Sequence, residues 1–288
     1  MAPVKSLKLK SPGKINLRLD VLGKRHDGYH DLRMLNSSVS IFDDIEIEII
    51  DKGIEIICEN DPTVPSGEEN IVFQATKEIM AYSNKNVGVR ITINKNIPAG
   101  AGMGGGSSNA AAVLMGLNQL LKVQLSKEKL MSIGLRFGAD IPFFMYGAPA
   151  IATGVGENLT KVKKLPKMPL VIIFPNQVVS TGAVYEKYRQ EDVSGANDDL
   201  PDEYTSKKAV LKVLNNDLES VTGKQYPIIN ELKELLVKNG AMGAQMTGSG
   251  PCVFGIFSDK EKAEKAFKKL QPKAEERNWK IFLTENLA

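Results

Sequence analysis

Residues 98–111 read Pro-Ala-Gly-Ala-Gly-Met-Gly-Gly-Gly-Ser-Ser-Asn-Ala-Ala, and this glycine-rich stretch decides how the rest of the chain is interpreted. Glycine tolerates positive φ and lets a ligand or another backbone approach closely. Directly behind it, residues 110–121 carry apolar side chains at helical spacing. A helix that opens after such a loop presents unsatisfied N–H groups and the positive end of its dipole. The stretch therefore predicts a phosphate-binding loop, to which Ser107 and Ser108 add hydroxyl groups.

A flexible linker followed by a serine N-cap is the alternative interpretation of the same stretch. Linkers rarely run straight into so apolar a helix, which favours the phosphate loop. The loop does not end in the Gly-Lys-Ser/Thr of a Walker loop, and no acidic residue follows at the spacing of a dinucleotide-binding βαβ unit. The sequence thus predicts a phosphate loop of another kind.

Composition argues against several classes of protein. The 288 residues include 37 Lys and Arg against 34 Asp and Glu, a formal net charge of +3, and 42% of them are hydrophobic. This balance is ordinary for a globular chain and lacks the basic excess expected of a nucleic-acid-binding protein. There is no secretion signal and no run of about 18 apolar residues, so we expect a cytoplasmic protein without a membrane partner. Cys58 and Cys252 lack the spacing of a disulfide framework or a zinc site.

The order of the predicted elements favours an α+β fold, because many strands are adjacent instead of alternating with helices. Strands are expected over 7–22 (with a break at Pro12-Gly13), 38–41, 44–50, 53–58, 87–93, 170–174, 244–247, 253–257 and 279–284, and helices over 71–82, 110–121, 126–137, 182–189, 207–213, 228–238 and 263–270. A polar connector over 161–169 marks the expected boundary between two domains, residues 1–160 and 161–288. A second glycine loop, residues 247–251, lies in the latter.

Three places carry groups suited to chemistry at a phosphate loop. Asp140 stands between a helix-ending glycine and a proline-containing segment, so its backbone should be rigid enough to position a general base. An aspartate that only forms a turn or caps a helix is the alternative. Lys14 could offset negative charge, whereas a strand lysine more often points to solvent. Tyr29 and His30 could stack on a nucleobase and read its polar edge, whereas a lone turn histidine often bonds its own backbone.

Three segments, in this order along the chain, resemble the motifs of the GHMP kinases, which phosphorylate galactose, homoserine, mevalonate and related small alcohols. They are residues 11–17 (Ser-Pro-Gly-Lys-Ile-Asn-Leu), the glycine loop, and residues 248–255 (Gly-Ser-Gly-Pro-Cys-Val-Phe-Gly). Gly13, Met103 and Asn109 stand where Ala, Leu and Asp are usual, and none of these departures removes a group that the reaction needs. The resemblance implies a two-domain α+β kinase, with an N-terminal domain like domain 2 of ribosomal protein S5 and a ferredoxin-like C-terminal domain.

The same resemblance implies that ATP, accompanied by Mg²⁺, binds the glycine loop and its neighbours. Asp140 would accept the proton of the acceptor hydroxyl, and Lys14 beside it would hold that carboxylate ionised and offset charge on the moving phosphoryl group. No acidic pair marks a metal cage supplied by the protein. Asn70 could equally cap a helix, and Lys95 could be a surface lysine. The positions implied to contact ATP are Pro98, Ala99, Gly100, Ala101, Gly102, Met103, Gly104, Gly105, Gly106, Ser107, Ser108, Asn70 and Lys95.

Residues 23–30, Gly-Lys-Arg-His-Asp-Gly-Tyr-His, match only part of the family. They resemble the branch whose acceptor alcohol carries a cytidine diphosphate. There, His30 would recognise the cytosine with Tyr29 beside it, and Tyr185 would cover the base. Asn16 would bond the small-molecule substrate near its reacting hydroxyl. A homoserine or mevalonate kinase and a non-catalytic binding protein on the same fold are the alternatives, and both a monomer and a homodimer are open.

Overall fold

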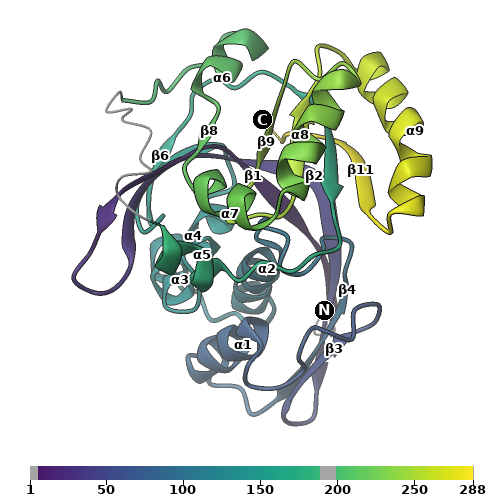
Figure 1. The fold of residues 1–288 in the computed structure, drawn as a ribbon. Coiled ribbons are helices and arrows are strands. Elements are labelled where there is room, and N and C mark those ends of the chain that lie inside the picture. Colours follow the sequence, from purple (N-terminus) through teal and green to yellow (C-terminus); the bar gives the residue numbers. More distant parts are fainter. Residues whose placement is uncertain (1–5, 189–198, 288) are drawn as a thin grey trace. The chain divides into compact units, whose positions relative to one another are not determined.

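The computed structural model describes residues 6–188 and 199–287 (Figure 1). Its internal contacts group the chain into two compact units, each discontinuous in sequence. The first unit comprises Met1–Gly13, Ile41–Ala99 and Gly104–Gly147, and the second comprises Lys14–Ser40, Gly100–Met103 and Ala148–Ala288. The chain passes between them inside two long strands, β1 (Ser6–Lys24) and β2 (His30–Ile50), inside the glycine loop, and between Gly147 and Ala148. A single domain boundary near residue 160 therefore stays a prediction.

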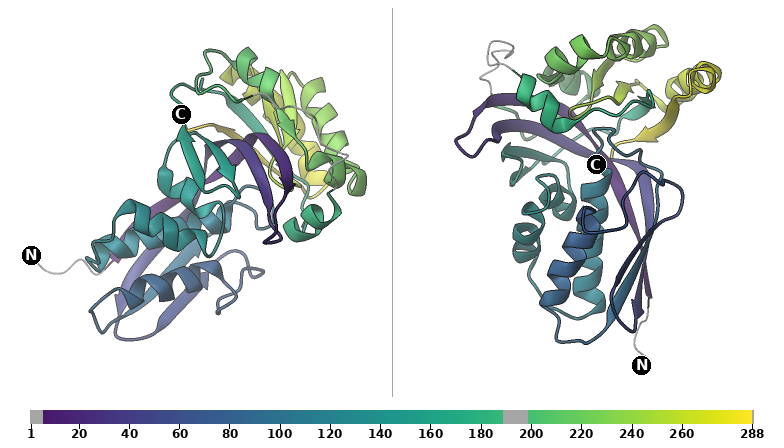
Figure 2. Two further views of the ribbon diagram at one scale, coloured as in Figure 1. Left: turned by 90° about the vertical axis from the view of Figure 1, so that its left-hand side faces the viewer. Right: turned by 60° about the horizontal axis from the view of Figure 1, so that its bottom comes forward.

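A sheet covered by helices forms the first unit (Figure 2). Besides parts of β1 and β2, its elements are β3 (Ile54–Cys58), α1 (Ile71–Ala81), β4 (Gly88–Asn94), α2 (Gly105–Leu120), α3 (Lys127–Leu135) and α4 (Ile141–Tyr146). β3 runs parallel to β4, and β4 pairs antiparallel with the C-terminal half of β2. Side chains alternate across a strand, so Ile45 and Ile47 point into the core while their neighbours do not. Gly116 of α2 lies against Ile47 and Leu9 on this apolar face.

The second unit holds the remaining strand segments and a separate sheet. Its elements beyond β1 and β2 are β5 (Ala150–Gly154), β6 (Asn158–Lys161), β7 (Pro169–Phe174), α5 (Thr181–Lys187), α6 (Lys207–Val213), β8 (Asn215–Asn216), α7 (Glu219–Gln225), α8 (Ile228–Lys238), β9 (Gly243–Met246), β10 (Val253–Ile256), α9 (Lys260–Glu276) and β11 (Lys280–Glu285). β2 pairs with β5 and β5 with β6, both antiparallel, while β8 runs parallel to β1.

The separate sheet has the strand order β11-β7-β10-β9, and all of its neighbours are antiparallel. Helices α8 and α9 lie against it (Figure 1). Leu232 and Leu236 of α8 and Ala266 of α9 pack with Val171 and Val253 of the sheet in one buried cluster. This part of the chain matches the ferredoxin-like arrangement that the resemblance implies, and the α+β class is confirmed.

Several elements differ from the sequence-based expectations. β1 is continuous through Pro12 and Gly13, and one strand, β2, replaces the two predicted over 38–41 and 44–50. Near Pro12, β1 has β2 on one side and pairs with β8 only at Arg18 and Leu19, so the proline lies on an edge strand, where a missing N–H is tolerated. The sequence missed β5, β6, α4, β8 and α7. Residue 189, where the helix over 182–189 was expected to end, lies outside the described residues.

Within residues 6–188 and 199–287, no helix combines the length and the apolar character needed to cross a membrane.

Candidate functional site

The glycine loop leads into the N-terminus of α2. The helix begins at Gly105, earlier than predicted, because the sequence-based reading took the poorly helix-forming Gly105 and Gly106 for loop. Its first intrahelical bond runs from Ser108 N to Gly104 O at 2.9 Å, so the N–H groups of the first turn have no partner within the helix. The buried Ser108 hydroxyl has no hydrogen-bond partner among the described residues either. This turn therefore offers several donors to an anion.

Lys95 lies beside this first turn. Its side chain is only 5% exposed and forms an ion pair with the fully buried Asp43. A Cβ placed on Gly105 would lie 3.1 Å from Lys95 Nζ, so the lysine ammonium and the start of α2 are close neighbours. The alternative of a surface lysine is wrong, because the side chain is buried. A cation thus stands where the sequence predicted contact with a nucleotide.

Asn70 caps α1, as the alternative interpretation held. Its Oδ1 accepts a hydrogen bond from Val72 N at 2.8 Å, and its Nδ2 donates to Pro65 O at 2.6 Å. The next residue, Ile71, lies against Gly106, so α1 and α2 begin side by side. The capping bonds occupy the Asn70 amide, and its contact with ATP stays a prediction.

Asp140 is the residue immediately before α4, and it is half-buried. It occupies the N-cap position of α4 and lies in a turn, as the alternative interpretation held, but its side chain makes no capping hydrogen bond. Gly138 lies against the first turn of α2, since a Cβ there would be 3.3 Å from Ser107 Oγ. The segment that carries Asp140 is thereby held next to the first turn of α2 within the first unit. Its partner Lys14 belongs to the second unit, and their pairing stays a prediction.

Lys14 is buried at 4% exposure, so the expectation that a strand lysine points to solvent fails here. Its Nζ donates to Asn16 Oδ1 at 2.8 Å, and its backbone N donates to Met103 O at 2.9 Å. Lys14 and Asn16 share one face of β1 because side chains alternate along a strand. The strand therefore holds the ammonium group at a fixed place beside the glycine loop.

The Asn16 amide is fully engaged inside the protein. Its Oδ1 also accepts from Gly248 N at 2.8 Å and from Thr247 Oγ1 at 3.2 Å. Its Nδ2 donates to Asn36 Oδ1 at 2.7 Å, and the residue is 0% exposed. Asn16 thus ties β1 to the second glycine loop, and its predicted hydrogen bond to substrate stays a prediction.

The second glycine loop packs directly against residues 101 and 102 of the first. Gly102 has a φ of +75°, and a Cβ there would lie 2.2 Å from Thr247 O and 3.0 Å from Gly250 O. Cys252 N donates to Ala101 O at 3.3 Å. Two backbones in such direct contact leave room only for glycine. The 247–251 loop is therefore more than a plain turn, because it fixes residues 100–103 of the first glycine loop.

The turn between β1 and β2 presents His30. Arg25 pairs with Asp27 and with Asp31, and Asp27 Oδ1 accepts from Tyr29 N at 3.1 Å, so the Gly-x-Arg-x-Asp-Gly-Tyr-His string closes on itself. Tyr29 is 63% exposed. These bonds order the turn without using His30.

His30 faces two tyrosines of the second unit. Its ring stacks on Tyr185 with centroids 5.2 Å apart and planes at 27°, and it meets Tyr188 edge-on at 6.4 Å. Burial and then the charge of Lys24 lower the pKa of His30, so the neutral imidazole is favoured. The structure thus brings His30 and Tyr185 together as predicted. Tyr188 was missed, although its spacing of three from Tyr185 on one helix turn was a usable signal.

A buried ionic cluster on β1 and β2 also escaped the sequence-based reading. Arg18 Nε donates to Asp20 at 2.8 Å, and Arg33 Nε donates to the same carboxylate at 3.1 Å. Asn215 Nδ2 donates to Asp20 Oδ1 at 3.0 Å. Nearby, burial raises the pKa of Tyr204 to about 12. The cluster lies beyond Asn16 along β1 and helps to fix that strand.

Among the described residues, no group of three or more His, Cys, Asp or Glu side chains is arranged to hold a metal ion. A divalent ion that accompanies a nucleotide often keeps waters and phosphate oxygens as ligands and takes few from the protein.

Two family models match the chain. The model described as GHMP kinases N terminal domain matches residues 70–148, which contain the first glycine loop and Asp140. The model described as GHMP kinases C terminal matches residues 206–276, which contain the second glycine loop.

Relatives are similar over nearly their whole length. A protein from Citrifermentans bemidjiense is 45% identical over 277 residues, covering 96% of this chain and 97% of the relative. One from Geobacter metallireducens is 48% identical over 266 residues, covering 91% and 93%. Both are named 4-diphosphocytidyl-2-C-methyl-D-erythritol kinase. A crystal structure of 4-(cytidine 5'-diphospho)-2C-methyl-D-erythritol kinase matches with a TM-score of 0.81 at 32% identity, covering 98% of this chain and 100% of that chain.

Proposed function

The chain belongs to the GHMP kinase family, and from this premise we propose that it transfers the γ-phosphoryl group of ATP to the 2-hydroxyl of 4-diphosphocytidyl-2-C-methyl-D-erythritol. The products are the 2-phosphate and ADP, in the non-mevalonate route to isoprenoid precursors. The observation that carries the proposal is the stack of His30 on Tyr185, which fits a cytosine-binding position. The name shared by both near-full-length relatives supports the same acceptor.

ATP would bind with its phosphates at the first turn of α2. The helix N–H groups, the Ser108 hydroxyl and the Lys95 ammonium are donors of the kind that phosphate oxygens require. The orphaned Ser108 hydroxyl also fits one oxygen ligand of a magnesium ion, with phosphate and water supplying the rest. When bound, Mg²⁺ would neutralise part of the phosphate charge.

Transfer forms a bond from the acceptor oxygen to the γ-phosphorus while the bond to the β–γ bridging oxygen breaks and ADP leaves. Asp140, held next to the first turn of α2 by Gly138, would accept the hydroxyl proton. The Lys14 ammonium, held by Asn16, would stabilise negative charge as the phosphoryl group moves. Most of the rate enhancement in such reactions comes from positioning and charge stabilisation, which these buried contacts serve.

The cytosine would be recognised at His30. A neutral imidazole presents one N–H donor and one acceptor to the polar edge of a base, and the lowered pKa of His30 favours that state. Tyr185 would cover the face of the ring, and exposed Tyr29 would flank it. A homoserine or mevalonate acceptor has no base to occupy this place.

The proposal extends to the setting of the enzyme. It would act in the cytoplasm, where ATP and its acceptor are small soluble ligands, as a monomer or a homodimer. Its ATP-binding domain would span residues 1–160, and residues 161–288 would form the domain that completes the cytidine site.

An acceptor panel tests the proposed function. ADP release is measured with ATP, Mg²⁺ and, in turn, the cytidine diphosphate alcohol, homoserine and mevalonate. We expect the highest kcat/KM for the cytidine diphosphate alcohol. Preference for an alcohol without cytidine would reassign the acceptor, and absence of ADP release with every alcohol would favour a non-catalytic binding protein.

A further inference from the structure

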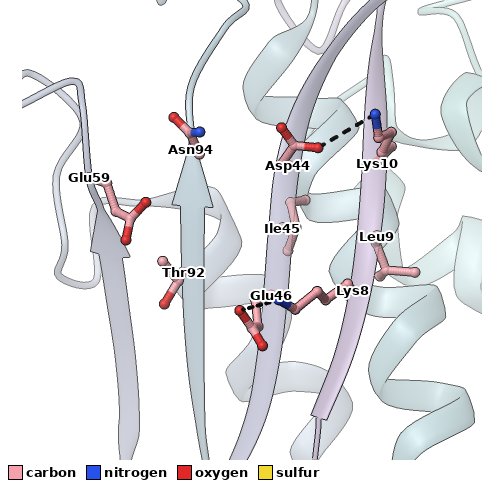
Figure 3. Close-up of a pocket in the computed structure, with 9 residues that line it drawn as sticks. All are labelled: Lys8, Leu9, Lys10, Asp44, Ile45, Glu46, Glu59, Thr92 and Asn94. Carbon is pink, nitrogen blue, oxygen red and sulfur yellow. Dashed lines mark ion pairs between the residues drawn. The ribbon is translucent and has the colours of Figure 1, made fainter.

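Asp43 and Lys95 lie at one end of the first unit's sheet, on its helix-covered face. The register of β2 and β4 pairs Asp44 with Asn94, and Asp43 and Lys95 are the next residues along each strand. Asp44 and Asn94 are among the side chains that line a depression of about 480 Å³. This depression lies on the face of the sheet that the helices do not cover (Figure 3). Because side chains alternate across a strand, Asp43 and Lys95 belong to the opposite face, where α2 packs.

The Asp43 carboxylate is used completely inside the protein. Its Oδ1 accepts from Asn96 N at 2.7 Å and from Ile97 N at 2.8 Å. Its Oδ2 forms the ion pair with Lys95 Nζ, and the side chain is 0% exposed. Asp43 therefore fixes both the backbone that leads into the glycine loop and the lysine that precedes it.

Lys95 keeps donor capacity beyond Asp43. An ammonium group has three N–H bonds, and the pair with Asp43 uses one of them. The group lies beside Gly105, whose lack of a side chain leaves it room, since a Cβ would come within 3.1 Å of Nζ. The remaining N–H bonds are thus available at the turn whose backbone N–H groups have no helical partner.

A buried ion pair is weak evidence for a contribution to stability. Removing two charges from water costs several kcal/mol per ion, and a pair of apolar side chains often stabilises a core as well or better. Elsewhere on the same face of the sheet, the buried side chains are apolar ones such as Ile45 and Ile93, whereas Asp43 and Lys95 are charged. Their charge therefore calls for a functional reason, and the phosphate-binding turn beside them supplies one.

We propose that Asp43 is a positioning residue for the nucleotide: it holds the Lys95 ammonium against the first turn of α2, where that ammonium donates to bound ATP. The inference rests on the proposed function, because it takes ATP as the ligand of this turn. It adds a residue that itself never touches ATP. Its effect should be confined to the nucleotide, because its carboxylate bonds to Lys95, Asn96 and Ile97, all in the first unit.

The test uses three variants and one control. Asp43→Asn keeps an oxygen for Asn96 N and Ile97 N but removes the charge that holds Lys95. Lys95→Met removes the ammonium at similar side-chain length, and the double variant removes both charges. The control is Glu55→Gln, which breaks the exposed ion pair with Arg90 in the same sheet. MgATP binding is measured by titration without acceptor, together with kcat, both KM values and unfolding in denaturant.

Asp43→Asn and Lys95→Met should each weaken MgATP binding about tenfold or more, the loss of a charge-assisted hydrogen bond. The double variant should bind as weakly as Lys95→Met while unfolding at a higher denaturant concentration than Asp43→Asn, because it buries no unpartnered charge. In every variant the acceptor KM should change by less than about twofold, because the substitutions lie at the nucleotide and not at the acceptor. Glu55→Gln should match the wild type.

Wild-type MgATP affinity in Asp43→Asn, or its recovery in the double variant, would overturn the proposal and leave the pair a structural one. If Asp43→Asn does not fold, Lys95→Met and the double variant decide, and wild-type affinity in either overturns it. A wild-type protein that binds no MgATP would overturn the proposed function as well. If the wild type binds MgATP and the variants bind it with the same affinity, only the role of Asp43 would be overturned.

Discussion

Gly102→Ala tests whether the second glycine loop fixes the phosphate loop. An alanine at a φ of +75° costs about 1–2 kcal/mol, because its Cβ crowds the following carbonyl. That Cβ would also lie 2.2 Å from Thr247 O, which belongs to backbone and cannot turn away like the end of a side chain. One loop must move, and overpacking of this kind costs about 1–3 kcal/mol more. The expected loss of stability is therefore about 2–5 kcal/mol.

Gly100→Ala is the matched control in the same loop. Its φ is +65°, so it carries the same left-handed cost, but its nearest neighbour is Val178 Cγ1 at 3.1 Å, the end of a side chain that is 73% exposed and can rotate. We expect this variant to lose only about 1–2 kcal/mol. The difference between the two variants isolates the contact with Thr247.

Unfolding in denaturant and steady-state kinetics measure both effects. Residues 100–103 lead directly into α2, so Gly102→Ala should raise the KM for ATP about tenfold or more, while Gly100→Ala should change it less than about threefold. Equal stability and equal KM for ATP in the two variants would refute the reasoning, because the contact at Thr247 would then have no consequence.

Three further predictions follow from the second unit. Burial and the charge of Lys24 lower the pKa of His30 from 6.5. The unfolded chain therefore takes up the proton first, and the protein loses stability as the pH falls below 6.5. An NMR titration should find the His30 midpoint below 6.5, and His30→Gln should make stability depend less on pH in that range. A midpoint at or above 6.5 would contradict this. Tyr185→Ala should raise the acceptor KM about tenfold, because stacking on the base is lost, whereas Tyr185→Phe should keep the wild-type acceptor KM. Equal acceptor KM values in the two variants would argue against the stack. Asp20→Asn should lower the free energy of unfolding by about 3–5 kcal/mol, since Arg18 and Arg33 lose a shared buried carboxylate, and a loss under about 1 kcal/mol in denaturant would rule this out.

The sequence predicted the features that local chemistry dictates. A run of glycines ahead of an apolar helix has few uses other than close approach to a ligand or another backbone, so the glycine loop and α2 could be placed without the fold. The helix expected over 126–137 is present as α3, with Ser126 as its N-cap, whose side chain accepts from Lys129 N. The motif order then identified the family, and the comparisons confirm that identification.

Features that depend on contacts far apart in the chain could not be predicted. Asp43 fell in the gap between two predicted strands, and only the pairing of β2 with β4 brings it to Lys95. For Lys14, a solvent-facing side chain stood as the alternative to a catalytic one, because nothing local shows that the Asn16 amide and the second glycine loop enclose it. The contact of Gly102 with Thr247 joins residues 145 positions apart and likewise could not be predicted from the sequence. Tertiary packing, not local propensity, decides each of these.

The central claim is that this chain phosphorylates the 2-hydroxyl of a cytidine diphosphate alcohol with Asp140 as the base. The most direct measurement is ³¹P NMR of the product formed from ATP, Mg²⁺ and 4-diphosphocytidyl-2-C-methyl-D-erythritol, with Asp140→Asn as the matched variant. We expect the wild type to yield ADP and a new phosphomonoester on the intact cytidine diphosphate alcohol. Asp140→Asn, which keeps the shape of the side chain and loses its basicity, should yield neither while still binding ATP. Absence of the phosphomonoester with the wild type, or its formation by Asp140→Asn at a near-normal rate, would contradict the account.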